Sequence, residues 1–360
     1  MKRFLSLVLV IATICATTAF AINDVYESDV VTYTAGSYSY DVWSSLYVDN
    51  KYQGAVWAAT SDQSRVPANY IGVNAMLFDE NDGTIVSTGW SYNSTSDIFH
   101  MRSTTDEWEP GLVQAGGQVR LYSGTGYVTY DAPRTVFASN NRMISTLANT
   151  LVNGQYPVNS KGESYGSMML EDFVGELPDL IKAKTNEGLV GYIKESDLNP
   201  DINTPAQAAA YTQALEENNT IPLYNSEGNV IGTFELETSE TIPDALYQSG
   251  LARMHLNSGK YPVTNNGKTY GPLLSDEYTG GEEPDLIRVR ATNGEWGYAL
   301  SDDFNGPEII TLEDAAAYMA NCPESWTIPV YDLDGRVVGE FEFKSGTIPT
   351  SEVQRVLNSK

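Results

Sequence analysis

Between residues 22 and 134 the chain is built of short runs that contain many β-branched and aromatic side chains. "QGAVWAAT", "IGVNAMLFD" and "QVRLYSG" are typical, and clusters of turn-forming residues separate them. Runs of this kind, rich in Val, Tyr, Trp and Thr, are the pattern of an all-β sandwich or barrel. Two of the turns contain Gly83 and Gly126, which suit hairpins. We therefore expect an antiparallel β-sandwich domain over residues 22–134.

The hydrophobic period changes after Pro133. Met143, Leu147 and Leu151 recur at every fourth position, as on one face of an amphipathic helix, and Gly154 can end that helix. The pattern predicts a helical linker over residues 135–155.

Two stretches further along the chain are nearly the same. "YPVNSKGESYG" begins at Tyr156 and "YPVTNNGKTYG" at Tyr261, and "PDLI" follows each of them, at Pro178 and Pro284. An internal repeat of this length indicates a duplicated domain, because each copy is long enough to hold a core of its own.

Each copy contains the same elements in the same order. A hairpin is followed by a helix, "TPAQAAAY" from Thr204 and "TLEDAAAY" from Thr311, in which the threonine is the expected N-cap. A second hairpin follows, "TIPLYNSEGNVIGTFE" in one copy and "TIPVYDLDGRVVGEFE" in the other. We expect two α+β modules (ββαββ) over residues 156–243 and 261–349, joined by a helical linker over 244–260 and followed by a tail over 350–360.

The N-terminus has the pattern of a secretory signal peptide over residues 1–21. Lys2 and Arg3 precede the apolar run "FLSLVLVIATICA", and "AFA" is the small-x-small pattern that signal peptidase cleaves. The run is shorter than the roughly 20 residues that a membrane-spanning helix needs. We expect cleavage between Ala21 and Ile22, and a secreted, extracellular protein.

Cysteine use agrees with export from a Gram-positive bacterium. Cleavage would remove Cys15 and leave Cys322 as the one cysteine, so no intramolecular disulfide is expected. Cys322 aligns with Leu215 of the first copy. This alignment favours a buried packing position over the alternative, a reactive thiol.

The charge restricts the possible partners. The chain has 47 acidic and 21 basic residues, for a net charge of −26. Such a field repels the phosphates of nucleic acids and anionic membrane lipids. We expect no nucleic-acid partner and no membrane partner after signal cleavage.

The repeat resembles one found in exported proteins of Gram-positive bacteria, and the residues that carry the resemblance are the Tyr-Pro, Tyr-Gly, Pro-Asp-Leu-Ile and Gly-Tyr elements within 156–349. It is similar to extracellular segments of some BlaR-type membrane metallopeptidases, where it lies outside the catalytic domain. The resemblance implies a domain type and no chemistry. The chain lacks HExxH, so peptidase activity does not follow.

Few residues are candidates for catalysis or metal binding. His100 and His255 are the only histidines, and both are expected to be structural. The acidic turns "DENDG" and "DLDG" resemble calcium loops, but a simple hairpin turn explains them better. We expect no catalytic residue, metal or cofactor; the weak metal candidates are Asp79, Asp82, Asp332 and Asp334.

Aromatic residues give one further functional alternative. The tryptophans of the β-domain would form either a stacking platform for sugar or peptide, or part of the core, and strands favour the core; they are Trp43, Trp57, Trp90 and Trp108. Together these patterns predict a secreted, non-catalytic binding protein whose unknown partner is an extracellular protein or glycan. The alternative is an extracellular hydrolase that uses carboxylates to act on polysaccharide or peptide.

Overall fold

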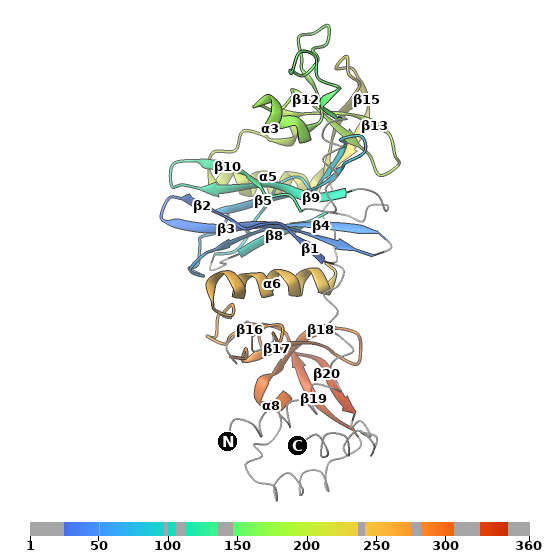
Figure 1. Cartoon of the computed structure of the whole chain (residues 1–360). Coiled ribbons are helices and arrows are strands. Elements are labelled where there is room, and N and C mark those ends of the chain that lie inside the picture. Colours follow the sequence, from blue (N-terminus) through green and yellow to red (C-terminus); the bar gives the residue numbers. More distant parts are fainter. Residues whose placement is uncertain are drawn as a thin grey trace, which may run out of the picture. The chain divides into compact units, whose positions relative to one another are not determined.

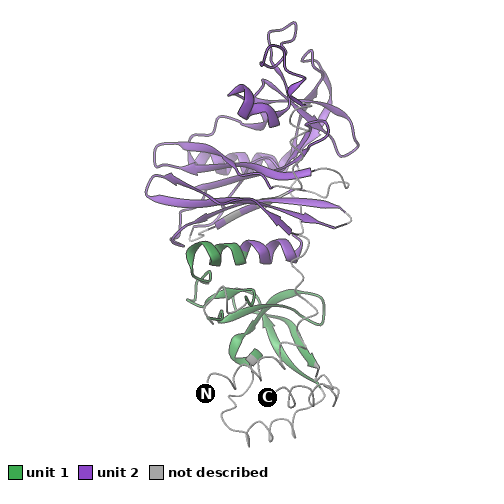
Figure 2. Cartoon of the chain, viewed as in Figure 1, with its two compact units in different colours: residues 1–22, 251–360 green, residues 23–250 purple. Residues whose placement is uncertain are grey.

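The computed structural model describes residues 25–49, 51–96, 100–105, 113–135, 147–236, 242–274, 282–305 and 325–344, and these are mostly β-sheet (Figure 1). The chain forms two compact units. One contains residues 23–250, and the other residues 1–22 and 251–360 (Figure 2). The expected signal peptide and its cleavage site at Ala21 and Ile22 lie outside the described residues.

The unit of residues 23–250 contains a sandwich of two sheets. One sheet has the order β1-β3-β4-β8, with β2 on β3; its strands are β1 (Val25–Glu27), β2 (Val31–Ala35), β3 (Tyr38–Val48), β4 (Tyr52–Thr60) and β8 (His100–Thr104). The facing strands are β5 (Ile71–Asp79), β6 (Ile85–Ser87), β7 (Ser91–Tyr92), β9 (Val113–Tyr122) and β10 (Tyr127–Ala132). Alternate residues such as Val42, Val56, Val73 and Val119 fill the core between the sheets.

The second sheet of this sandwich continues into the first repeat. Its strands there are β11 (Tyr165–Gly166), β12 (Leu180–Lys184), β13 (Val190–Lys194), β14 (Thr220–Tyr224) and β15 (Val230–Glu235). β12 pairs with β6 in parallel at Ala183 and Ile85, so that ten strands form one sheet. Four helices connect these strands: η1 (Met168–Leu170), α3 (Glu171–Val174), α4 (Glu195–Leu198) and α5 (Pro205–Glu217).

The sandwich and the first repeat share a hydrophobic core, which differs from the expected division at residues 135–155. Phe78 and Ile85 of the sandwich belong to the same buried cluster as Ile181 and Leu223 of the repeat. The two segments accordingly belong to one compact unit. Of the expected helical linker, residues 136–146 lie outside the described part of the chain.

The start of α5 confirms the predicted cap. The hydroxyl of Thr204 accepts a hydrogen bond from the amide of Gln207, and the side chain of Gln207 accepts one from the amide of Thr204, with Pro205 as the first helical residue. The equivalent helix from Thr311 lies outside the described residues, as does Cys322. Leu215 on α5 packs against the shared core.

The unit that contains residues 251–360 has a sheet of its own. Its order is β16-β17-β18-β19-β20, and its elements are β16 (Tyr270–Gly271), β17 (Leu286–Arg290), β18 (Trp296–Leu300), α8 (Ser301–Asn305), β19 (Ser325–Tyr331) and β20 (Val337–Lys344). A further helix, α6 (Asp244–Ser258), lies within the range expected for the second helical linker.

The repeated motifs make the same contacts in both copies. Asp179 accepts hydrogen bonds from the amide and hydroxyl of Ser164 at 2.7 and 2.8 Å, and its own amide donates back to that hydroxyl. Thr269 and Asp285 repeat this clasp. It fixes the parallel pairing of β11 with β12 and of β16 with β17. The recurring Ser/Thr and Asp therefore have a structural role.

The recurring glycines permit close packing. A Cβ at Gly166 would lie 2.5 Å from Cδ1 of Tyr156, and one at Gly271 would lie 3.0 Å from Cδ1 of Tyr261. The tyrosine that opens each motif thus packs on the glycine that ends it. The repeated motif is explained by packing, which directs the search for a functional site to other residues.

Candidate functional site

Polar side chains gather on the outer face of the hairpin of β9 and β10. Strand alternation turns these residues away from the sandwich core. These side chains belong to two cross-strand pairs, in which Arg120 lies opposite Thr129 and Gln118 lies opposite Asp131. Nε of Arg120 donates to the Thr129 hydroxyl at 3.4 Å, and Nε2 of Gln118 donates to the Asp131 carboxylate at 3.1 Å. The pairs form one wall of a cavity.

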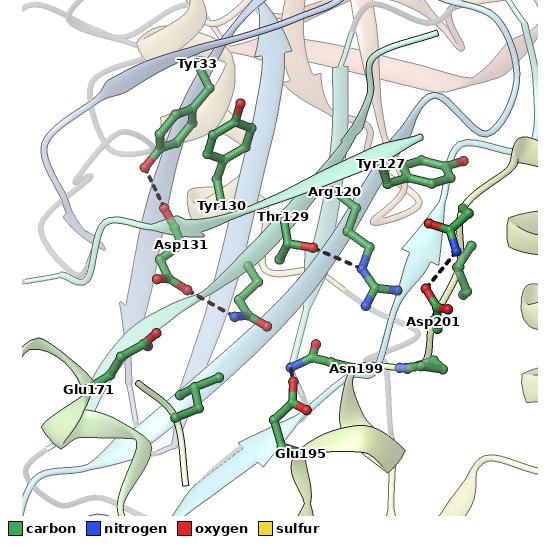
Figure 3. A pocket seen from close by; sticks show the side chains of 15 residues that line it. Tyr33, Arg120, Tyr127, Thr129, Tyr130, Asp131, Glu171, Glu195, Asn199 and Asp201 are labelled. Carbon is green, nitrogen blue, oxygen red and sulfur yellow. Dashed lines mark hydrogen bonds between the residues drawn. The ribbon is translucent and has the colours of Figure 1, made fainter. Parts of the chain in front are cut away.

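The opposite wall comes from the first repeat. Glu171 at the start of α3 and Glu195 at the start of α4 line the cavity, together with Leu177 and residues 199–203 (Figure 3). The cavity volume is about 660 Å³, within the range of small-molecule sites. All of its lining residues belong to the compact unit of residues 23–250.

Arg120 is held rigidly in this wall. Its side chain is 6% exposed, its guanidinium carbon lies 4.2 Å from the ring centroid of Trp90, and it donates to the Tyr92 hydroxyl at 3.3 Å. Trp90 in turn donates from Nε1 to the carbonyl of Leu198 and the side chain of Asn199, both at 3.2 Å. These contacts join the two walls, so the cavity does not depend on a mobile side chain.

Two tyrosines lie at the edge of the sandwich beside the cavity, with their rings packed against the sandwich core. The rings of Tyr33 and Tyr130 are stacked with centroids 4.2 Å apart, and the Tyr33 hydroxyl donates to the Asp131 carbonyl at 2.9 Å. Burial raises the pKa of Tyr33, so its hydroxyl stays protonated at neutral pH. Figure 3 shows both rings on the other side of β10 from the Thr129 and Asp131 side chains, so the pair covers the edge of the sandwich core.

The cavity is rich in hydrogen-bond acceptors. Its lining includes four carboxyl groups and one guanidinium; the carboxyl groups belong to Asp131, Glu171, Glu195 and Asp201. Burial, and then the charge of Asp131, raise the pKa of Glu171 to about 7, and nearby Arg134 opposes that shift. The side-chain oxygen Oε1 of Gln118 is buried without a hydrogen-bond partner. A ligand that donates hydrogen bonds suits this lining.

The candidate calcium turn at Asp79 and Asp82 is held by internal hydrogen bonds. Asp79 accepts from the amide and side chain of Asn81, and Asp82 accepts from the amide and hydroxyl of Thr84. Nζ of Lys182 donates to the carbonyl of Asp82 at 2.7 Å. The two carboxylates therefore stabilise a hairpin turn, and the ammonium group of Lys182 lies beside Asp82.

The second acidic turn has the same internal character. Asp332 accepts from the amide of Arg336, whose guanidinium lies 3.7 Å from the carboxylate of Asp334. Within the part of the chain that the structure describes, no group of three or more His, Cys, Asp or Glu side chains is placed to hold a metal ion.

Neither histidine lines the cavity. Burial lowers the pKa of His100 to about 3, which keeps it neutral. His255 stacks on Tyr261 with ring centroids 4.1 Å apart, and burial lowers its pKa as well. Both histidine side chains are packed within the fold.

The tryptophans Trp43, Trp57 and Trp90 are fully buried, which confirms the core interpretation for these three and contradicts a stacking platform. Trp43 and Trp57 stack at 5.7 Å, and Trp57 packs against Tyr247 and Gly250 of α6. Trp108 lies outside the described residues.

Our sequence analysis missed every residue of the cavity. One signal was present: polar Gln118 and Arg120 before the hairpin turn, and polar Thr129 and Asp131 after it, alternate with apolar residues and so share one sheet face. The contribution of Glu171 from a distant segment had no local signal.

Comparison of the chain with models of protein families, with curated proteins and with solved structures gives no match. Among the residues that the structure describes, none of the helices combines the length and the apolar character needed to cross a membrane.

Proposed function

We propose that this protein is a secreted, saccharide-binding protein and that the cavity between the β9–β10 hairpin and the first repeat is its binding site. The observation that carries the proposal is the rigid polar wall of Gln118, Arg120 and Asp131, which faces the carboxyl groups of the first repeat across the cavity. Export is supported by the N-terminal pattern, in which basic residues precede an apolar run and "AFA".

The chemistry of the lining favours an uncharged, hydroxyl-rich ligand. Sugar hydroxyl groups donate to carboxylate and amide oxygens and accept from the Arg120 guanidinium, so one ligand satisfies both kinds of group. Four carboxyl groups against one guanidinium oppose an anionic ligand, as does the net charge of −26.

The second copy of the module is not part of the proposed binding site. Residues 156–243 and 261–349 are copies of one α+β module, and matching clasps at Ser164 and Thr269 support that reading. The positions of Glu195 and Asn199 on the cavity wall align with Ser301 and Asn305 of the second copy. Because Glu195 is replaced by Ser301, the second copy does not reproduce this wall.

Binding of soluble oligosaccharides, measured by isothermal titration calorimetry across a panel of plant and bacterial-wall fragments, tests the proposal. Thr129 projects into the cavity from β10 and is exposed, so Thr129→Trp should fill the site and weaken binding at least about tenfold. Val128 is also exposed but lies on the other face of the same strand, so Val128→Trp is the matched control and should bind like the wild type. Equal loss in both variants, or no binding of any saccharide, would refute the proposal.

A further inference from the structure

Two carboxyl groups approach the same part of the cavity from its two walls. Asp131 belongs to β10, and Glu171 begins α3 in the first repeat. Figure 3 shows both side chains directed toward the space between the strands and the helix, and the charge of Asp131 acts on Glu171. A ligand seated in the cavity would contact both groups.

The two carboxyl groups have different surroundings. Asp131 is tied to Gln118 by a hydrogen bond of 3.1 Å. The Glu171 carboxyl is half-buried and accepts no hydrogen bond from the described residues, while Asp131 is exposed. Its pKa of about 7 leaves Glu171 protonated in a large fraction of molecules at neutral pH. Carboxyl groups in such unlike environments can divide the roles of acid and base between them.

We propose that this cavity hydrolyses a glycosidic bond, with Glu171 as the general acid and Asp131 as the general base. The proposal rests on saccharide binding at the same site and adds an activity to it. It assigns residues to the pair of carboxylates that glycoside hydrolysis needs. The charge of Arg134, whose guanidinium carbon lies 4.6 Å from the ring centroid of Phe78, acts on Glu171 and opposes the rise of its pKa.

The reaction balances with water as the only co-reactant. Glu171 gives its proton to the glycosidic oxygen as the bond from that oxygen to the anomeric carbon breaks. A water molecule forms the new bond to the anomeric carbon and gives a proton to the Asp131 carboxylate. Proton exchange with solvent then restores both groups, and the products are two shorter saccharides with one new reducing end.

The test is an assay of reducing ends released from the saccharides that bind, and of nitrophenol released from 4-nitrophenyl glycosides. Wild-type protein should release product, and Glu171→Gln and Asp131→Asn should each lower kcat by at least about 100-fold. Glu187 is an exposed acid in the β12–β13 turn and does not line the cavity, so Glu187→Gln is the matched control and should keep full activity.

A pH profile separates chemistry from a structural role. Activity should fall as the pH rises above about 7, where Glu171 loses its proton, and the residual activity of Glu171→Gln should lack that fall. Aryl glycosides with good leaving groups should be the least affected by Glu171→Gln, because they need little help from an acid. Calorimetric binding without release of reducing ends would overturn the catalytic proposal and leave the binding proposal standing. Loss of all saccharide binding would overturn both.

Discussion

Nε2 of Gln118 donates a hydrogen bond to the Asp131 carboxylate at 3.1 Å across the β9–β10 hairpin, while Oε1 of the same amide is buried without a partner. Gln118 is 5% exposed, so the unpaired oxygen is costly in the free protein. The hydrogen bond from Nε2 holds the Asp131 carboxylate on the cavity wall.

Replacement of Gln118 by Leu should weaken saccharide binding without a large loss of stability. The variant removes a buried unpaired acceptor, so the free energy of unfolding in urea should change by less than about 1 kcal/mol or increase. Saccharide affinity should fall about tenfold because Asp131 loses its fixed orientation. A large loss of stability with unchanged affinity would show that Gln118 serves the fold alone.

Stability should depend on pH through Glu171. Its pKa is about 7 in the folded protein against an ordinary value of 4.5, so the folded state holds the proton more tightly than the unfolded chain. The contribution is fully present below pH 4.5 and is lost as the pH rises to about 7. After discounting for its partial exposure, we expect a loss of about 1–2 kcal/mol.

Urea unfolding of the wild type and of Glu171→Gln at pH 5 and pH 8 tests this prediction. The other titrating groups are the same in both proteins, so their contribution cancels when the two changes in stability are subtracted. Glu171→Gln should lose less stability between the two pH values. Equal losses in the two proteins would contradict the assignment.

The clasp between Ser164 and Asp179 should stabilise the first module. Ser164→Ala removes the hydroxyl that links it to Asp179, at an expected cost of about 0.5–1.5 kcal/mol, and amide exchange over residues 164–181 should accelerate. Ser164→Thr should be neutral, because Thr269 makes the same contacts in the second copy. Ser160 donates a single exposed hydrogen bond to Glu227, so Ser160→Ala is the control with a smaller effect.

A methyl group at Gly166 should be destabilising because of Tyr156. The added Cβ would lie 2.5 Å from the ring, so the ring has to move, and we expect a cost of about 1–3 kcal/mol. At Gly232 the nearest atom is a Leu189 methyl carbon at 3.4 Å, an ordinary contact. Thermal unfolding should show a clear loss for Gly166→Ala and little change for Gly232→Ala; the reverse order would contradict the packing account.

Local features of the fold could be predicted from the sequence, and long-range ones could not. The Thr204 cap and the repeated hairpins depend on neighbouring residues, so their signals are complete within a short window. The pairing of Ile85 with Ala183 joins distant segments, and no local pattern specifies it. For that reason the sequence suggested a boundary where the structure has a shared sheet and core.

In the candidate site, too, the local part could be predicted from the sequence and the long-range part could not. Gln118 and Asp131 lie on one face of the hairpin because side chains alternate along a strand, and this alternation can be read from the sequence. Glu171, in contrast, reaches the cavity only because the first repeat packs on the sandwich. For Trp57 the sequence favoured the core over a ligand platform, and the packing of Tyr247 and Gly250 of α6 against its ring agrees with the core. Burial of an aromatic side chain depends on elements that its own strand does not reveal.

The most direct measurement is a crystal structure of the protein with the saccharide that binds most tightly in the calorimetric panel. The account predicts density for that saccharide in the cavity, with hydroxyl groups within hydrogen-bond distance of Asp131 and Arg120 and a glycosidic oxygen beside Glu171. Soaking Glu171→Gln crystals would prevent turnover during data collection. Saccharide density at another surface, with the cavity between β10 and α3 empty, would contradict the account.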